Sequence, residues 1–128
     1  MDSRTDDILN RFSDSWTKTE LFYDNLIKNH PGFDRLVPLR QFIGRLRDKG
    51  ESKYFRLGTS MHTLIISRSV DNGLRLDQKH IKIESISTDD FDVTLRDGDK
   101  AYREFRIKNF EDSRLTRLLK TLKDTLVD

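Results

Sequence analysis

The sequence predicts an α+β fold, with N-terminal helices, a mainly antiparallel sheet of about five strands, and a C-terminal helix packed on one face of the sheet. Apolar residues recur at helical spacing before residue 50, alternate at period two from about 54 to 108, and return to helical spacing after residue 112. Successive strands joined by short turns favour antiparallel pairing. The 128 residues suit one domain, 1–128.

The first helix is indicated by an apolar stripe at every fourth position, formed by Ile8, Phe12 and Trp16. Thr17 and Glu20 then have the spacing of a capping box. Either a second helix restarts there and buries Leu21, Phe22, Leu26 and Ile27, or one bent helix continues. The turn 29–32, which contains Pro31 and Gly32, ends this segment.

A second helix is expected over about 33–49, with Pro38 near its start and Gly50 as its C-terminal stop. Its apolar stripe consists of Leu36, Leu39, Ile43 and Leu46.

Five strands are expected in the middle of the chain. The first two, 54–57 and 61–69, are predicted to separate near Gly58, and the run 63–66 is apolar on both faces, as in a central, covered strand. A turn at 71–73 precedes a strand at 80–87. The last two strands, centred on 91–95 and 105–107, form a hairpin around the turn 97–99.

The last helix begins at Asp112 or Ser113 and carries a leucine stripe at positions 115, 118, 119, 122 and 126. We expect Leu115, Leu118, Leu119 and Leu122 to pack against the final hairpin, at Val93, Leu95, Phe105 and Ile107. The outer face of this helix is basic, with Arg114, Arg117, Lys120 and Lys123.

The amino-acid composition excludes several classes of functional site. The chain has no cysteine, which excludes disulfides, thiolate metal sites and a cysteine nucleophile. The N-terminal residues are acidic and polar, unlike a secretory signal, and no apolar run approaches the length of a membrane span. We therefore expect a cytoplasmic protein without a membrane association. The net charge of +2 is weak support for nucleic-acid binding.

The most clustered cations lie in 35–56, and they are candidates for phosphate contacts: Arg40, Arg45, Arg47, Lys53 and Arg56. Arg40 and Arg47 are seven residues apart and would share a helix face, which Lys53 and Arg56 extend if the first strand runs beside it. The alternative is a solvated face balanced by Asp34, Asp48 and Glu51.

A catalytic centre is only weakly indicated. Ser60 and His62 would share one face of a strand, which permits a nucleophile and base pair, but the surrounding residues lack the Gly-x-Ser-x-Gly pattern of a nucleophile elbow. The three histidines do not have metal-ligand spacing, and the glycines do not form a phosphate-binding loop. We expect no cofactor, no metal and no catalytic residue, and the alternative is a hydrolase centred on Ser60 and His62.

The outer face of the predicted sheet carries mixed charge, which indicates either solvent exposure with cross-strand ion pairs or a docking face for a protein, with Arg96, Tyr102 and Arg106 as its candidates. The leading hypothesis is a small non-enzymatic protein-binding module, of a bacterial-type regulatory or immunity role, with a protein partner. Nucleic-acid binding through 35–56 is the alternative.

Overall fold

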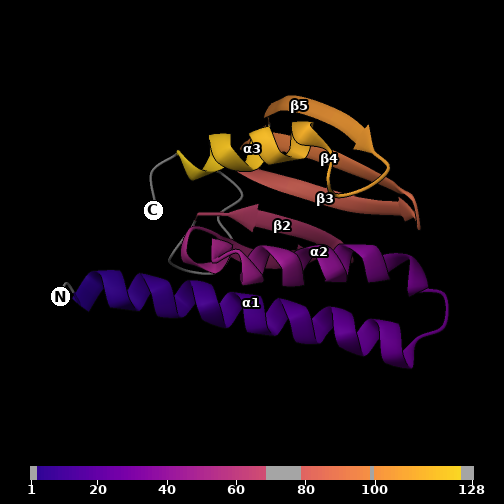
Figure 1. The fold of residues 1–128 in the computed structure, drawn as a ribbon, viewed down its shortest axis with the longest axis horizontal. Helices are drawn as coiled ribbons and strands as arrows, with labels where there is room; N and C mark the ends of the chain where they lie inside the picture. Colours follow the sequence, from indigo (N-terminus) through magenta and orange to yellow (C-terminus); the bar gives the residue numbers. More distant parts are fainter. Residues whose placement is uncertain (1–2, 69–78, 99, 125–128) are drawn as a thin grey trace.

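The computed structural model describes residues 3–68, 79–98 and 100–124. Its elements follow in the order α1 (Ser3–Asn29), η1 (Asp34–Leu36), α2 (Val37–Asp48), η2 (Glu51–Lys53), β1 (Arg56–Ser60), β2 (Thr63–Ser67), β3 (Lys79–Ser87), β4 (Asp90–Asp97), β5 (Lys100–Ile107) and α3 (Ser113–Lys123). The strands form one antiparallel sheet in sequence order, and α2 and α3 lie on the same face of it (Figure 1). The predicted α+β class is confirmed. The predicted turn at 71–73, position 99 and Leu126 lie outside the described residues.

Of the two alternatives for this segment, the restart at Thr17 is wrong, because the structure has one continuous helix, α1. Its buried stripe runs through Phe12, Trp16, Thr19 and Tyr23, at spacings of four, three and four residues. The apolar phase therefore does not slip: Thr19 fills the position where the pattern had seemed to break. Leu21, which was expected to be buried, is 62% exposed, so the capping-box interpretation was wrong.

The helix α1 runs beside β1, the edge strand of the sheet, and its residues Ser15 and Trp16 hydrogen-bond to the backbone at the start of that strand. The Ser15 hydroxyl accepts from the Leu57 backbone N–H at 3.0 Å, and Trp16 Nε1 donates to the Phe55 carbonyl at 2.8 Å. An edge strand otherwise leaves backbone groups without partners. Polar atoms of α1 thus satisfy the Leu57 N–H and the Phe55 carbonyl at this edge of the sheet.

The second predicted helix is confirmed, with its first turn split off as η1. Pro38 lies in the first turn of α2, where a missing N–H breaks no helical hydrogen bond. Gly50 follows the helix with φ of +80°, a left-handed conformation that glycine adopts without the steric cost of a Cβ atom. The chain can therefore reverse at once toward the sheet.

The first hairpin differs from the prediction in its turn. The strands separate at Met61 and His62, a two-residue loop closed by the pair Ser60 and Thr63, and Gly58 lies inside β1 opposite Ile65. Met61 has φ of +56° although it is not glycine. A glycine within a strand and a methionine at the turn reverse the usual preferences, which is why the sequence pointed to the wrong position.

The central strand β2 is buried on both faces, as its continuous apolar run predicted. The final hairpin is also confirmed, with Val93 opposite Phe105 and Phe91 opposite Ile107. Leu115, Leu118 and Leu122 of α3 belong to one buried cluster with residues from β2, β3, β4 and β5. The C-terminal helix thus packs on the sheet as expected.

Candidate functional site

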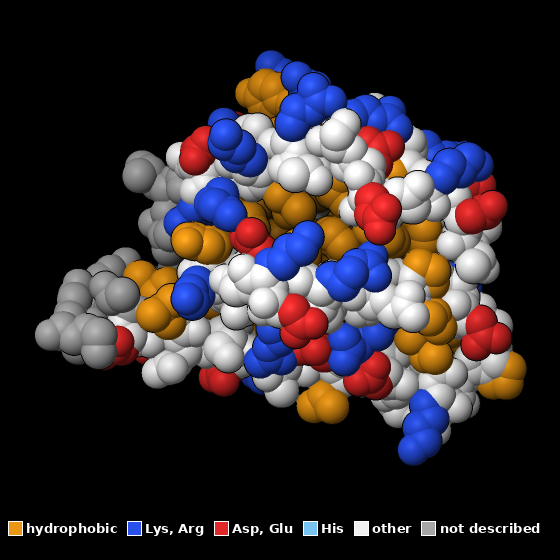
Figure 2. Space-filling model, in the orientation of Figure 1, with side chains coloured by type: hydrophobic (Ala, Val, Ile, Leu, Met, Phe, Trp, Pro, Cys, Tyr) orange, Lys and Arg blue, Asp and Glu red, His pale blue; other side chains and the backbone are white. Residues whose placement is uncertain are grey.

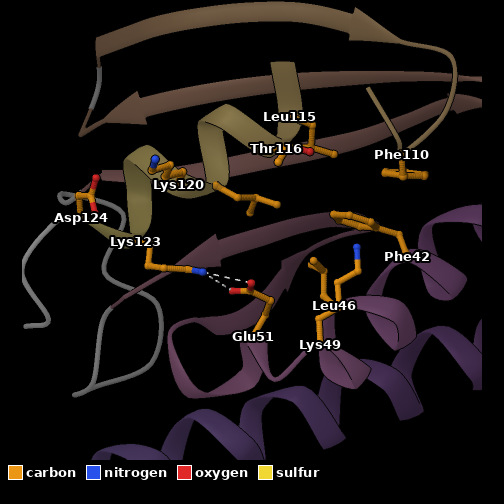
Figure 3. A pocket seen from close by; sticks show the side chains of 11 residues that line it. Phe42, Leu46, Lys49, Glu51, Phe110, Leu115, Thr116, Lys120, Lys123 and Asp124 are labelled. Carbon is orange, nitrogen blue, oxygen red and sulfur yellow. Dashed lines mark hydrogen bonds and ion pairs between the residues drawn. The ribbon is translucent and has the colours of Figure 1, made fainter. Parts of the chain in front are cut away.

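A groove separates α2 from α3 and has a volume of about 410 Å³. In Figure 2 it is the band of hydrophobic side chains across the middle of the molecule, with basic side chains on both banks. Its apolar lining is Phe42, Leu46, Phe110, Leu115 and Leu119. We call this the α2–α3 groove; its side chains come from both helices and from the segment between β5 and α3 (Figure 3).

The apolar lining follows from local sequence spacing. Phe42 and Leu46 are four residues apart on α2, and Leu115 and Leu119 are four apart on α3, so each helix presents one pair to the groove. Phe110 joins the two helices, because its ring stacks on Phe42 with centroids 4.6 Å apart. The buried floor is therefore shared by both helices and continuous with the core.

The banks of the groove are charged. Lys123 of α3 reaches across to Glu51 of η2, with an Nζ to Oε2 distance of 2.9 Å (Figure 3). The Nζ of Lys123 also lies 4.4 Å from the centre of the Tyr54 ring. Lys49 and Lys120 also line the groove, and within the described part of the chain neither forms an ion pair. Two lysines thus remain available to a ligand.

The C-terminal end of α3 is held by a half-buried arginine, Arg68. The Arg68 guanidinium donates a hydrogen bond to the carbonyl of Lys123, where the helix leaves its last carbonyls without helical partners. Burial lowers the pKa of Arg68, and the nearby Asp124 carboxylate opposes that effect. This contact fixes the bank of the groove that carries Lys123.

The basic residues predicted from 35–56 do not form one open surface. Arg40 contacts Asp24 at 2.7 Å and Glu20 at 3.2 Å, and Arg47 contacts Glu20 and the Thr17 hydroxyl. The hydrogen bond to Asp24 is the main reason that the pKa of Arg40 is raised. The balancing acids come from α1 and not from the expected local residues. Arg40 and Arg47 therefore join two helices.

The other three cations of that set lie elsewhere. Arg45 is exposed on α2, about 140° around the helix from Arg40 at 100° per residue. Lys53 is exposed in η2, and Arg56 is half-buried on β1. The first strand runs beside α1, so the expected extension of the α2 face by Lys53 and Arg56 is wrong.

Ser60 and His62 do not share a strand face. Ser60 ends β1, and His62 lies in the hairpin loop with its ring 4.6 Å from that of Phe33. The backbone carbonyl of His62 accepts a hydrogen bond from the Tyr23 hydroxyl at 3.1 Å. The geometry on which the hydrolase hypothesis depended was therefore wrong, because His62 lies in the turn that follows Ser60 and not on a strand.

On the outer face of the sheet, Arg106 forms a cross-strand ion pair with Asp92 at 2.8 Å, as the solvated alternative predicted. Arg96 is half-buried on β4. Tyr102 is 52% exposed and occupies a β-bulge, because Leu95 pairs with Arg103 while Arg96 pairs with Ala101. The three candidate docking residues thus differ in surroundings, and their role stays a prediction.

Comparisons with known protein families, with curated proteins and with solved structures found no match. None of the described helices is long and apolar enough to cross a membrane. Among residues 3–68, 79–98 and 100–124, no group of three or more histidines and carboxylates is placed to hold a metal ion.

Sequence reasoning assigned all the leucines of the last helix to the core and did not find the groove. One signal was present: Leu118 and Leu119 are adjacent, so the apolar stripe is wider than a single seam. In the structure Leu118 is buried, whereas Leu119 is half-buried and lines the groove. The opposite wall of the groove comes from α2, and no pattern in the sequence indicated that α2 lies beside α3.

Proposed function

We propose that this chain is a non-enzymatic protein-binding module, and that its α2–α3 groove binds an amphipathic, acidic segment of a partner protein. The observation that carries the proposal is the combination of an apolar floor with a lysine on each bank that forms no ion pair to any described residue, Lys49 from the end of α2 and Lys120 from α3. Grooves of this kind bind one apolar face of a peptide helix, and flanking charges select its polar residues.

The chemistry of the partner follows from the lining. Leu119 and Thr116 offer a partly open apolar edge to a side chain such as leucine or phenylalanine. Burying one such side chain contributes roughly 1.5–3 kcal/mol. Lys49 and Lys120 favour carboxylates on either side of that anchor, and they disfavour a basic segment by like-charge repulsion.

Selection of peptides from a random displayed library would test the proposal directly. Twelve-residue peptides retained by the protein are expected to combine apolar residues at i and i+3 or i+4 with aspartate or glutamate. Each synthetic peptide is then titrated by fluorescence polarisation against the parent chain and against Thr116→Trp, which fills the groove from an exposed position. We expect at least tenfold weaker binding, equivalent to about 1.4 kcal/mol.

Two charge-matched variants complete the test. Lys49→Glu should weaken binding of the acidic peptides, whereas Lys18→Glu, at an exposed position of α1, should leave it unchanged. Circular dichroism melting curves of all three variants show that the fold is retained. Peptides that bind Thr116→Trp and Lys49→Glu as tightly as the parent chain would refute the groove as the binding site.

A further inference from the structure

We infer that a second groove, between β5 and α3, binds the phosphate backbone of single-stranded nucleic acid. This groove lies on the other side of α3 from the α2–α3 groove and has a volume of about 680 Å³. Its floor is Leu95 and Leu118, and its walls carry four cations, Arg103, Arg114, Arg117 and Lys120. We call it the β5–α3 groove.

Most of this positive charge is not neutralised within the described residues. Arg103 and Lys120 form no ion pair there, and Arg117 makes only long contacts of 3.4 Å to Ser113 of its own helix. Arg114 is paired with Asp112 at 2.9 Å, and among the described residues of the lining Asp124 is the one acid. The β5–α3 groove therefore differs from the α1–α2 contact, where Arg40 and Arg47 are bound to carboxylates.

The spacing of the cations fits a chain of phosphates better than a single phosphate. Arg114, Arg117 and Lys120 follow at intervals of three residues along α3, so their backbone positions span ~9 Å of the helix axis at 1.5 Å per residue. Arg103 faces them from β5, on the sheet face to which its partner Leu95 belongs. Guanidinium groups bind phosphate oxygens in pairs, which favours arginine in such a row.

One feature favours a single strand over a duplex: the cations line a groove between a helix and a strand, which admits one backbone, and they are not spread over a convex surface. A phosphopeptide with one phosphate would use only part of the row.

Fluorescence anisotropy with a labelled twenty-residue oligothymidine tests this inference. The parent chain should bind, and the affinity should fall steeply with salt, since phosphate neutralisation releases counterions. The double variant Arg103→Glu, Arg117→Glu changes two exposed side chains and should weaken binding at least tenfold at low salt. Arg103→Lys, Arg117→Lys should retain most of the affinity and the salt dependence.

The matched control is Arg45→Glu, Lys53→Glu, which makes the same charge change at two exposed cations of the 35–56 segment. It should bind oligothymidine within about twofold of the parent chain when the ionic strength is equal. Loss of binding in this control but not in the groove variant would overturn the inference and restore the 35–56 surface. Equal affinity for a duplex of the same length, tighter binding of a singly phosphorylated peptide, or no binding at low salt would also overturn it.

Discussion

The backbone N–H of Leu57 donates a hydrogen bond to the Ser15 hydroxyl, with a nitrogen to oxygen distance of 3.0 Å. The same hydroxyl donates to the carbonyl of Phe12 at 2.6 Å, and Ser15 is buried. The Ser15 hydroxyl is thus hydrogen-bonded both as donor and as acceptor, and it provides a partner for a backbone N–H of the edge strand β1. The N-terminal helix is attached to the sheet by this polar contact as well as by apolar packing.

Ser15→Ala should therefore destabilise the fold more than an ordinary serine substitution. It leaves the Leu57 N–H buried without a partner, which costs about 1–3 kcal/mol in free energy of unfolding. Urea denaturation followed by circular dichroism measures the change. Ser60→Ala, at an exposed position of the same strand, is the control and should stay within about 0.5 kcal/mol. Equal effects of the two substitutions would argue against the contact.

Glu20 joins α1 to α2 through two arginines, and its side chain is only 14% exposed. Glu20→Gln should lower the free energy of unfolding by roughly 1 kcal/mol, because an ion pair with limited exposure is weakly screened. A double-mutant cycle with Arg47→Gln should show coupling between the two positions. Asp7→Asn, which breaks an exposed pair with Arg11, is the control and should change stability by less than about 0.5 kcal/mol. No coupling between Glu20 and Arg47 would contradict a structural role.

Leu118 is 4% exposed in the core cluster beneath α3. Leu118→Ala should reduce the free energy of unfolding by about 2–5 kcal/mol, from lost burial and the cavity that remains. Because domains of this size have only about 5–15 kcal/mol in total, the melting temperature should fall by many degrees. Lys120→Ala, on the exposed side of α3, should hardly change it. A cooperative, equally stable chain after deletion of residues 112–128 would show that α3 lies outside the core.

Tyr23 gives the fold a dependence on alkaline pH. Burial raises the pKa of its phenol, whose hydroxyl donates to the His62 carbonyl. The stability associated with the neutral phenol is fully present below the pKa of an unfolded tyrosine, about 10, and is lost as pH rises above that value. Urea denaturation from pH 8 to pH 11 should show this decline.

Tyr23→Phe should flatten the alkaline decline, at the expense of roughly 0.5–1.5 kcal/mol at neutral pH for the lost hydrogen bond. Tyr102→Phe, which changes an exposed tyrosine, is the matched control and should keep the decline of the parent chain. An alkaline decline of the same size in Tyr23→Phe would mean that another group is responsible.

The sequence by itself determined the order of the elements, the antiparallel sheet and the C-terminal leucine helix. These features depend on periodicity, and the periods of 3.6 and 2 are visible in one dimension: Leu115, Leu118 and Leu122 mark one face of α3, and Phe91, Val93 and Leu95 mark one face of β4. The stop at Gly50 and the apolar run of β2 are similarly local signals.

The tertiary structure decided which charges are free and where the grooves lie. Arg40 and Arg47 resemble an open basic face in the sequence. In the structure Asp24, 16 residues before Arg40, and Glu20, 27 residues before Arg47, neutralise them across α1 and α2. The α2–α3 groove combines Phe42 with Leu119, and the β5–α3 groove combines Arg103 with Arg117. Whether a side chain is paired or available depends on neighbours that packing brings from distant positions in the sequence. The periodicity of the sequence does not indicate these neighbours.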